Sequence, residues 1–340
     1  MEIAFEHTFG AHCESGVTSN LLRYYGYNYS EPLVFGLSAS LYFVHLPFVK
    51  SLGFPMTAFR PMPGVIFARV TQLLGFKIRK KIFFNKNNGV KQLDKLLEKG
   101  IPTGCVTVMY HLPYLPMEYR YHFNSHNLCV IGKEGDNYLI SDPIILEKVT
   151  ISSHDLLRAR YFAKGAFPPL GKLYWIKSLP PQAPDLNKLL RKAILKNCYR
   201  MIHQPGPVPF IGVNAFQYLG NKIAKFPEIY GEKKAAQHLV HLFRLMEEMG
   251  TGGSGFRFIY AAFLQEAAEI TGMDELNDFS QRMSDIADQW RVFATEAGRI
   301  FKNRSSAKLD YQTLGDHLKA IGKQEEAFFA ELEKTVKSYS

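Results

Sequence analysis

Three side chains in the first 142 residues have the types that catalysis by a cysteine nucleophile requires: a thiol, an imidazole and a carboxylate. Cys13 lies in the stretch 10–16 that directly precedes residues 17–25, whose apolar positions share one helical face. His126 and Asp142 lie in later strand-like segments. At the first turn of a helix, unpaired backbone N–H groups favour the thiolate over the thiol. An arbitrary cysteine is more often a buried apolar residue, so this interpretation depends on the elements that surround it.

A predicted hairpin would bring the imidazole and the carboxylate together. Residues 126–132 predict a strand, 133–137 a turn, and 138–143 the partner strand. His126 starts the first strand and Asp142 ends the second, so both side chains come to the same end of the sheet. A histidine whose tautomer is fixed by a carboxylate can accept the proton of a thiol, as nucleophilic cysteine catalysis requires.

Further segments of the first half alternate between helical and strand-like patterns. The insert at 110–123, which contains Tyr114, is compatible with a cover over an active-site cleft or with a plain surface loop. We expect helical segments at 30–43, 65–74, 87–98 and 153–163, strands at 76–84, 101–109 and 172–176, and a loop around the prolines at 55–63.

The strand predicted at 76–84 alternates apolar and basic side chains. It would bury one face and expose Lys77, Arg79 and Lys81 on the other. Such a basic stripe is compatible with an ordinary solvated face or with docking of an acidic partner.

Composition narrows the class of protein. A chain of 340 residues with 46% hydrophobic content is long enough for two domains. Four cysteines at irregular spacing give neither a disulfide framework nor a metal-binding pattern, which favours a reducing, intracellular setting without zinc. The first residues lack the pattern of a secretory signal, and no run of about 20 apolar residues predicts a membrane span. We therefore expect a cytoplasmic protein without an integral membrane segment.

The formal net charge of +10 is concentrated in the first half, where residues 1–178 carry 20 Lys+Arg against 12 Asp+Glu. This excess indicates an acidic partner, attracted over long range. Nucleic acid fits less well, because no recognised binding motif accompanies the charge. The oligomeric state stays open, a homodimer included.

The second half is predicted to be a separate helical domain. After a proline-rich linker at 179–184, which follows an N-terminal domain at 1–178, the periodicity of residues 185–340 is helical. A glycine-rich turn at 250–255 precedes Arg257. It is compatible with a phosphate site at a helix N-terminus, formed by Gly252, Gly253 and Arg257, or with a tight turn between helices. We expect helices near 185–203, 210–225, 232–249, 256–271, 274–302 and 309–337.

Several of these motifs together resemble a known family. Residues 12–16, 30–36, the Leu-Pro-Tyr insert, 126–132 and 141–143 resemble the N-terminal domain of the butirosin biosynthesis protein H family. The turn at 250–257 is similar to the helical domain that commonly follows it. The resemblance spans about residues 5–178 and implies an α+β fold: a papain-like N-terminal domain with an antiparallel sheet, followed by an all-α domain.

The resemblance implies an acyltransferase of specialised-metabolite or lipid biosynthesis. An acyl group would pass from the phosphopantetheine thioester of an acidic acyl carrier protein, or from coenzyme A, to Cys13 and then to an amine or hydroxyl acceptor, without a bound cofactor. His126 would be the general base and acid and Asp142 the orienting carboxylate. His7 stands six residues before Cys13, where papain-like peptidases carry a glutamine, so His7 or the backbone N–H of Cys13 would bind the oxyanion.

Other assignments remain open. The same triad would serve a thioesterase or a cysteine peptidase if water reached the acyl-enzyme, and a papain-like scaffold without catalysis would be a binding protein. Glu14 and Glu31 are compatible with binding an acceptor amine or with capping and solvated roles. Tyr114 would contact substrate if the insert covers the cleft.

Overall fold

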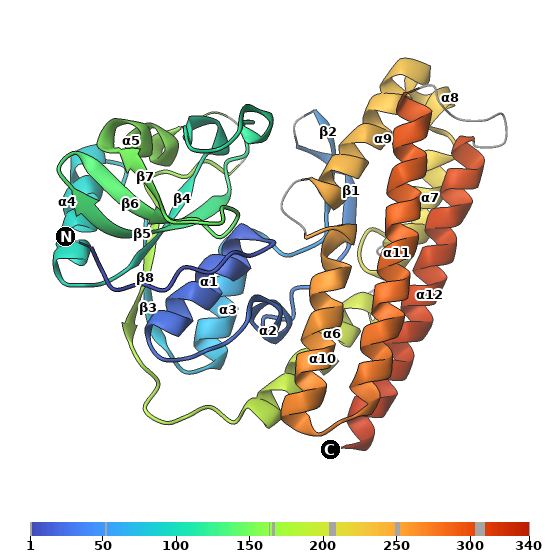
Figure 1. Ribbon diagram of the computed structural model, residues 1–340. Coiled ribbons are helices and arrows are strands. Elements are labelled where there is room, and N and C mark those ends of the chain that lie inside the picture. Colours follow the sequence, from blue (N-terminus) through green and yellow to red (C-terminus); the bar gives the residue numbers. More distant parts are fainter. Residues whose placement is uncertain are drawn as a thin grey trace. The chain divides into compact units, whose positions relative to one another are not determined.

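The structure is a computed structural model that describes residues 2–51, 53–162, 164, 167–203, 209–248, 252–302 and 310–339. The chain divides into two compact units (Figure 1). The first unit comprises residues 1–34 and 63–184, and the second comprises residues 35–62 and 185–340. The first unit combines an antiparallel sheet with helices, and the second unit is mainly helical, so the fold is of the predicted α+β class.

A six-stranded antiparallel sheet forms the centre of the first unit, in the order β3-β8-β4-β5-β6-β7. The predicted hairpin is present, and Gly135 adopts a positive φ of 55° in its turn. Strand β7 was not predicted, because a strand of four residues is too short to show an alternation. The strands are β3 (Lys77–Lys81), β4 (Thr103–Thr107), β5 (His126–Glu134), β6 (Asn137–Ser141), β7 (Val149–Ser152) and β8 (Leu173–Ser178).

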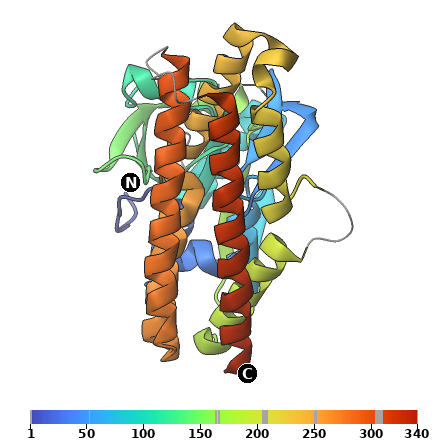
Figure 2. The same ribbon diagram turned by 90° about the vertical axis from the view of Figure 1, so that its right-hand side faces the viewer.

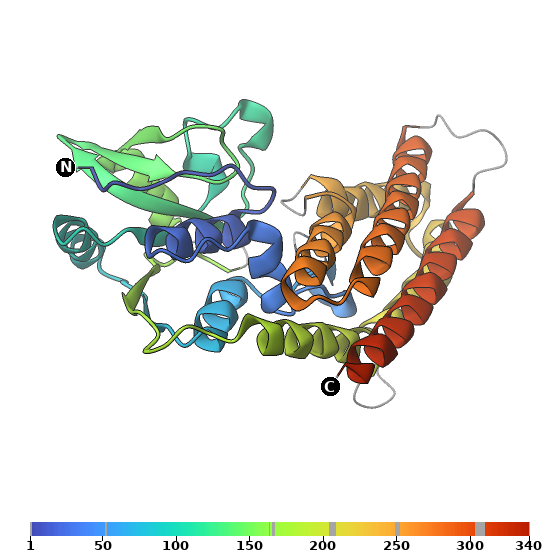
Figure 3. The same cartoon turned by 60° about the horizontal axis from the view of Figure 1, so that its bottom comes forward.

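Helix α1 (Cys13–Tyr24) packs along the sheet and contacts β5 (Figure 3). Val17, Leu21 and Leu22 on its apolar face are fully buried, and Gly26 follows the helix with a φ of 88°. Helix α4 is capped by Asn85, whose side chain accepts from the Asn88 N–H at 3.1 Å, so the helix begins one residue before the predicted start at 87. The remaining helices here are α2 (Glu31–Leu37), α3 (Val65–Leu73), α4 (Lys86–Glu98) and α5 (Ser153–Tyr161).

The predicted strand at 76–84 is shorter than its alternation suggested. β3 ends at Lys81, and the exposed fractions of Ile82 and Phe84 are 42% and 78%, whereas Phe83 is buried. From residue 82 the chain leaves the strand and turns toward α4. In this segment the odd-numbered Phe83 is buried and its even-numbered neighbours are exposed, the reverse of the predicted pattern. The prediction that Ile82 and Phe84 are buried is therefore wrong.

Residues 35–62 belong to the helical unit, not to the first domain as the sequence suggested. Phe43 stacks on Phe216 with ring centroids 4.4 Å apart, and Phe59 meets the Trp290 ring at 5.7 Å. The expected loop at 55–63 is in part a strand, because β1 (Val44–Ser51) and β2 (Phe54–Ala58) form a hairpin. Both strands are edges, which tolerate proline, and the register shifts between Leu46 and Lys50.

The helices predicted after the linker are present in the described residues of the second unit. The two longest, α11 and α12, lie side by side (Figure 2). No helix among the described residues combines the length and apolar character that crossing a membrane requires. The helices are α6 (Leu186–Ile202), α7 (Val213–Ile223), α8 (Phe226–Tyr230), α9 (Glu232–Glu247), α10 (Arg257–Thr271), α11 (Glu275–Phe301) and α12 (Tyr311–Ser338).

Candidate active site

Cys13 is the first residue of α1, where its backbone N–H has no acceptor within the helix. His12 is the N-cap, and its Nδ1 accepts from the Ser15 N–H at 3.3 Å. The Cys13 side chain is 4% exposed. The thiol therefore lies in a largely dry environment at the positive end of a helix, as the sequence predicted.

The other three cysteines are free thiols buried in the protein. Burial raises the pKa of Cys105 to about 11, and it raises the pKa values of Cys129 and Cys198 well above the ordinary value. These thiols stay protonated at neutral pH and pack in the core, as expected.

Two carboxylates predicted as possible amine ligands bind the backbone around Cys13 instead. Glu31 accepts from the N–H groups of Ala11 at 2.7 Å and His12 at 2.8 Å. Glu14 is fully buried, and its Oε1 accepts from the Ile66 N–H at 2.9 Å, at the start of α3. Glu31 thus fixes the loop that precedes Cys13, and Glu14 caps α3. Their interpretation as ligands for an acceptor amine is not supported.

The β5–β6 hairpin brings His126 and Asp142 together. His126 Nε2 lies 2.7 Å from Asp142 Oδ2, and both residues are buried. Burial alone lowers the pKa of His126, but the charge and hydrogen bond of Asp142, together with the Cys13 side chain, outweigh it and raise this pKa to about 10. The imidazole therefore interacts with both the carboxylate and the thiol, and the three predicted triad residues converge.

Tyr114 supports the carboxylate from the insert between β4 and β5. Its hydroxyl donates to Asp142 Oδ2 at 2.8 Å. Burial, followed by the charge of Asp142, raises the pKa of Tyr114 well above its ordinary value, so the hydroxyl stays protonated. Leu112 and Leu115 on either side are buried and anchor this part of the insert. Tyr114, predicted to bind substrate, therefore holds Asp142 through this hydrogen bond.

His7 does not fill the position of an oxyanion donor. Its Nδ1 lies 2.8 Å from Ser141 Oγ, and its Nε2 lies 2.9 Å from the carbonyl oxygen of Ile145. Both ring nitrogens are therefore engaged, and the prediction for His7 is corrected. The backbone N–H of Cys13, the alternative donor, remains available in the first turn of α1.

Asn127, the residue that follows His126, was not predicted as a site residue. Its side-chain Nδ2 lies 3.9 Å from Cys13 Sγ, within hydrogen-bonding distance for sulfur. The only signal in the sequence was an amide within an otherwise apolar strand, which by itself does not indicate which group it faces.

The glycine-rich turn of the helical unit has the geometry of a tight turn. Gly252 and Gly253 adopt φ values of 64° and 84°, a region that favours glycine. The Ser254 N–H donates to Glu247 Oε1 at 3.0 Å. The negative charge of this carboxylate would repel a phosphate group. The first part of the turn, at 250 and 251, lies outside the described residues.

Arg257 is not available to a phosphate either. It is fully buried and forms a bidentate ion pair with Glu325, with both N···O distances at 2.9 Å. Its third nitrogen donates to the Gly255 carbonyl at 2.8 Å, and the indole N–H of Trp290 donates to Glu325 at 2.7 Å. The prediction of a phosphate site at Gly252, Gly253 and Arg257 is therefore wrong, because Arg257 stabilises the helical core.

The predicted basic stripe is exposed. Lys77, Arg79 and Lys81 are solvent-accessible on β3, which is an edge strand of the sheet. Lysines on an edge also discourage pairing with another chain, so exposure alone does not assign them a partner.

Known families cover most of the chain. The model described as butirosin biosynthesis protein H, N-terminal, matches residues 12–143, a range that includes Cys13, His126 and Asp142. The model described as a domain of unknown function (DUF4872) matches residues 154–332, more than half of the chain. No curated protein matches. A crystal structure of a C39-like peptidase from Bacillus anthracis is 14% identical with a TM-score of 0.37, and the match covers 53% of this chain and 99% of that one.

The family matches agree with the α+β fold and support a papain-like cysteine enzyme. The chain belongs to the family of the DUF4872 domain, and its residues 12–143 match the N-terminal model of butirosin biosynthesis protein H.

Proposed function

We propose that the protein is an acyltransferase that moves an acyl group from a carrier-bound thioester through Cys13 to an amine or hydroxyl acceptor. The convergence of the Cys13 thiol with a buried imidazole held by Asp142 carries this proposal. Because Cys13 and His126 are 4% and 1% exposed, an acyl-enzyme formed here is poorly accessible to bulk water, which supports transfer over hydrolysis.

The reaction has two steps. His126 takes the proton of the Cys13 thiol and holds it as an imidazolium, and the thiolate then attacks the thioester carbonyl carbon, whose π electrons move to the oxygen. As the carbonyl re-forms, the bond to the pantetheine sulfur breaks and that sulfur takes the proton from His126. An acceptor amine or hydroxyl then attacks the acyl-enzyme while His126 accepts its proton, and the bond to Cys13 breaks with return of the proton to sulfur.

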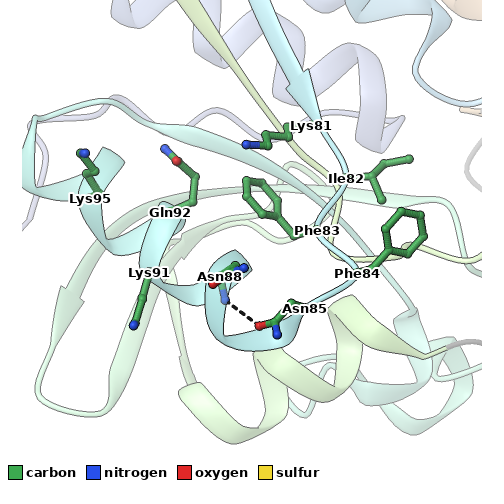
Figure 4. A pocket seen from close by; sticks show the side chains of 9 residues that line it. All are labelled: Lys81, Ile82, Phe83, Phe84, Asn85, Asn88, Lys91, Gln92 and Lys95. Carbon is green, nitrogen blue, oxygen red and sulfur yellow. Dashed lines mark hydrogen bonds between the residues drawn. The ribbon is translucent and has the colours of Figure 1, made fainter.

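The donor would be an acidic acyl carrier protein. The first unit carries 18 Lys+Arg against 12 Asp+Glu, which favours encounter with an acidic protein. A hollow between the end of β3 and α4 is lined by Lys81, Lys91 and Lys95 together with Ile82 and Phe84 (Figure 4). We propose this β3–α4 surface as the carrier-docking site, since exposed apolar groups beside several cations suit an acidic helical partner. Four free thiols suit a cytoplasmic location.

Intact-mass analysis tests the reaction. The protein is incubated with acyl carrier protein thioesters, and an adduct that persists until an amine or alcohol is added supports transfer. Steady release of free acid with water alone would contradict transfer and support the thioesterase or peptidase-like alternative. No adduct with any donor, carrier-bound or small, would support a non-catalytic binding protein.

Charge reversal tests the docking surface. Lys91→Glu with Lys95→Glu should raise the KM for the carrier thioester at least tenfold at low salt, an effect that salt reduces. Acylation by a small thioester should not change, because it needs no docking. Lys233→Glu with Lys234→Glu on α9 is the charge-matched control, and equal behaviour of both double variants would contradict this location.

A further inference from the structure

The side chain of Asn127 bridges Cys13 and Tyr174 inside the first unit. Its Nδ2 lies 3.9 Å from Cys13 Sγ and donates to the Ser125 carbonyl at 3.0 Å, while its Oδ1 accepts from the Tyr174 hydroxyl at 3.0 Å. Asn127 is only 2% exposed. A buried amide with this set of partners has a defined orientation.

The partners of Asn127 fix which end of the amide faces the sulfur. A backbone carbonyl can only accept, so the atom of Asn127 that faces the Ser125 oxygen must be the nitrogen. The oxygen must then face Tyr174, which donates its hydroxyl proton. One N–H of the amide is used on Ser125, and the second is the one available to Cys13 Sγ.

Tyr174 holds this orientation from β8. It is buried, and its ring centroid lies 4.7 Å from that of Phe67. A Cβ atom at Gly104 would clash with the Tyr174 ring, so a glycine at this position allows the ring to lie close to β4. Burial raises the pKa of Tyr174 well above its ordinary value, which keeps the hydroxyl a donor. The amide is therefore held before any substrate binds.

We propose that Asn127 is a catalytic residue that supplies the side-chain donor of the oxyanion hole, with Tyr174 as its positioning residue. This inference rests on the proposed acyl transfer. When Cys13 Sγ bonds to the carbonyl carbon, the developing oxyanion lies next to the sulfur. There it can accept from the Asn127 amide and from the backbone N–H of Cys13. Asn127 thus takes the role for which His7, with both nitrogens engaged, is unavailable.

Before attack, the same N–H stabilises the Cys13 thiolate. This gives two independent readouts: the rate of acylation by a small acyl thioester, and the pH dependence of alkylation by iodoacetamide, which needs no acyl transfer. If Asn127 served only as a hydrogen-bond donor to the Ser125 carbonyl, its replacement would change neither readout.

The test compares Asn127→Ala with Asn124→Ala, a matched control. Asn124 is also buried and donates to a backbone carbonyl, that of Lys164 at 2.7 Å. Loss of one oxyanion donor lowers kcat by roughly 10²- to 10³-fold, so single-turnover acylation of Asn127→Ala should fall by this factor at unchanged thioester affinity. Asn124→Ala should react like the wild type, and Tyr174→Phe should lose about tenfold, as expected for one hydrogen bond.

The alkylation readout separates this inference from the proposed function. Asn127→Ala should need a higher pH than the wild type for half-maximal alkylation. If the wild type is acylated and Asn127→Ala reacts at the same rate and with the same alkylation profile, the inference is wrong while acyl transfer stands. If the wild type is not acylated, the proposal of acyl transfer is wrong. In that case, an alkylation profile of Asn127→Ala equal to that of the wild type would overturn the inference as well. Asn127→Ser replaces Asn127→Ala if the latter does not fold.

Discussion

Replacing Asp142 by asparagine should change the protonation of the active-site histidine while keeping the shape of the side chain. Asp142 accepts hydrogen bonds from both His126 and Tyr114. The side chain of the Asp142→Asn variant would lack the negative charge, and its amide nitrogen could force the imidazole into the wrong tautomer.

The expected shift follows from the causes of the raised pKa. In the wild type the pKa of His126 is raised from 6.5 to about 10, and burial opposes this rise. At 1.36 kcal/mol per pKa unit, the rise corresponds to about 5 kcal/mol in favour of the imidazolium. The Asp142→Asn variant loses the two largest raising causes and keeps the burial. Its His126 should therefore titrate near or below 6.5, and be neutral at pH 8, where the wild type is protonated.

NMR titration of the imidazole Cε1–H signal measures this shift, with His126→Gln used to assign the signal. We expect a midpoint near pH 10 in the wild type and a midpoint near or below pH 6.5 in Asp142→Asn. Acylation of Cys13 should slow by roughly 10⁴-fold, as expected for an imidazole in the wrong tautomer. A wild-type midpoint below 7, or an unchanged midpoint in the variant, would refute the proposed coupling.

Three further substitutions have defined outcomes. Tyr114→Phe should slow single-turnover acylation about tenfold, because the orienting carboxylate loses a hydrogen bond, and a wild-type rate would contradict its positioning role. Glu325→Gln leaves the charge of Arg257 buried and should lower the free energy of unfolding by about 3–5 kcal/mol in urea denaturation, without changing acylation by a small thioester. Gly104→Ala should displace the Tyr174 ring and lower both Tm and acylation, and an unchanged acylation rate would contradict the rigid support proposed for the amide.

The elements that carry the triad could be predicted because their signals are local. The helix at Cys13 shows an apolar face and a glycine stop, and the hairpin of His126 and Asp142 shows two apolar strands around a turn. Likewise, the composition change after the linker predicted the helical unit.

The supporting residues could not be predicted because they act over long separations. Tyr114 binds a carboxylate 28 residues away, and Asn127 faces a sulfur 114 residues away. His7 matched a position in a pattern, but Ser141 and the Ile145 carbonyl take its nitrogens, and both partners lie more than 130 residues away. The local periodicity of a sequence carries no information about such long-range contacts.

The placement of residues 35–62 failed for a related reason. Their aromatic side chains have the same periodicity whichever core they enter, and only the partners on α7 and α11 decide it. Arg257 beside a glycine-rich turn likewise suggested a phosphate site until Glu325, 68 residues later, proved to be its partner.

The central claim is that the acyl group is carried by Cys13. The most direct test is peptide mapping by mass spectrometry after incubation with an acyl carrier protein thioester, in parallel with Cys13→Ala. The acyl mass should lie on the peptide that contains Cys13, disappear when an acceptor amine is added, and be absent from the variant. An acyl group on another residue, or equal labelling of Cys13→Ala, would contradict the account.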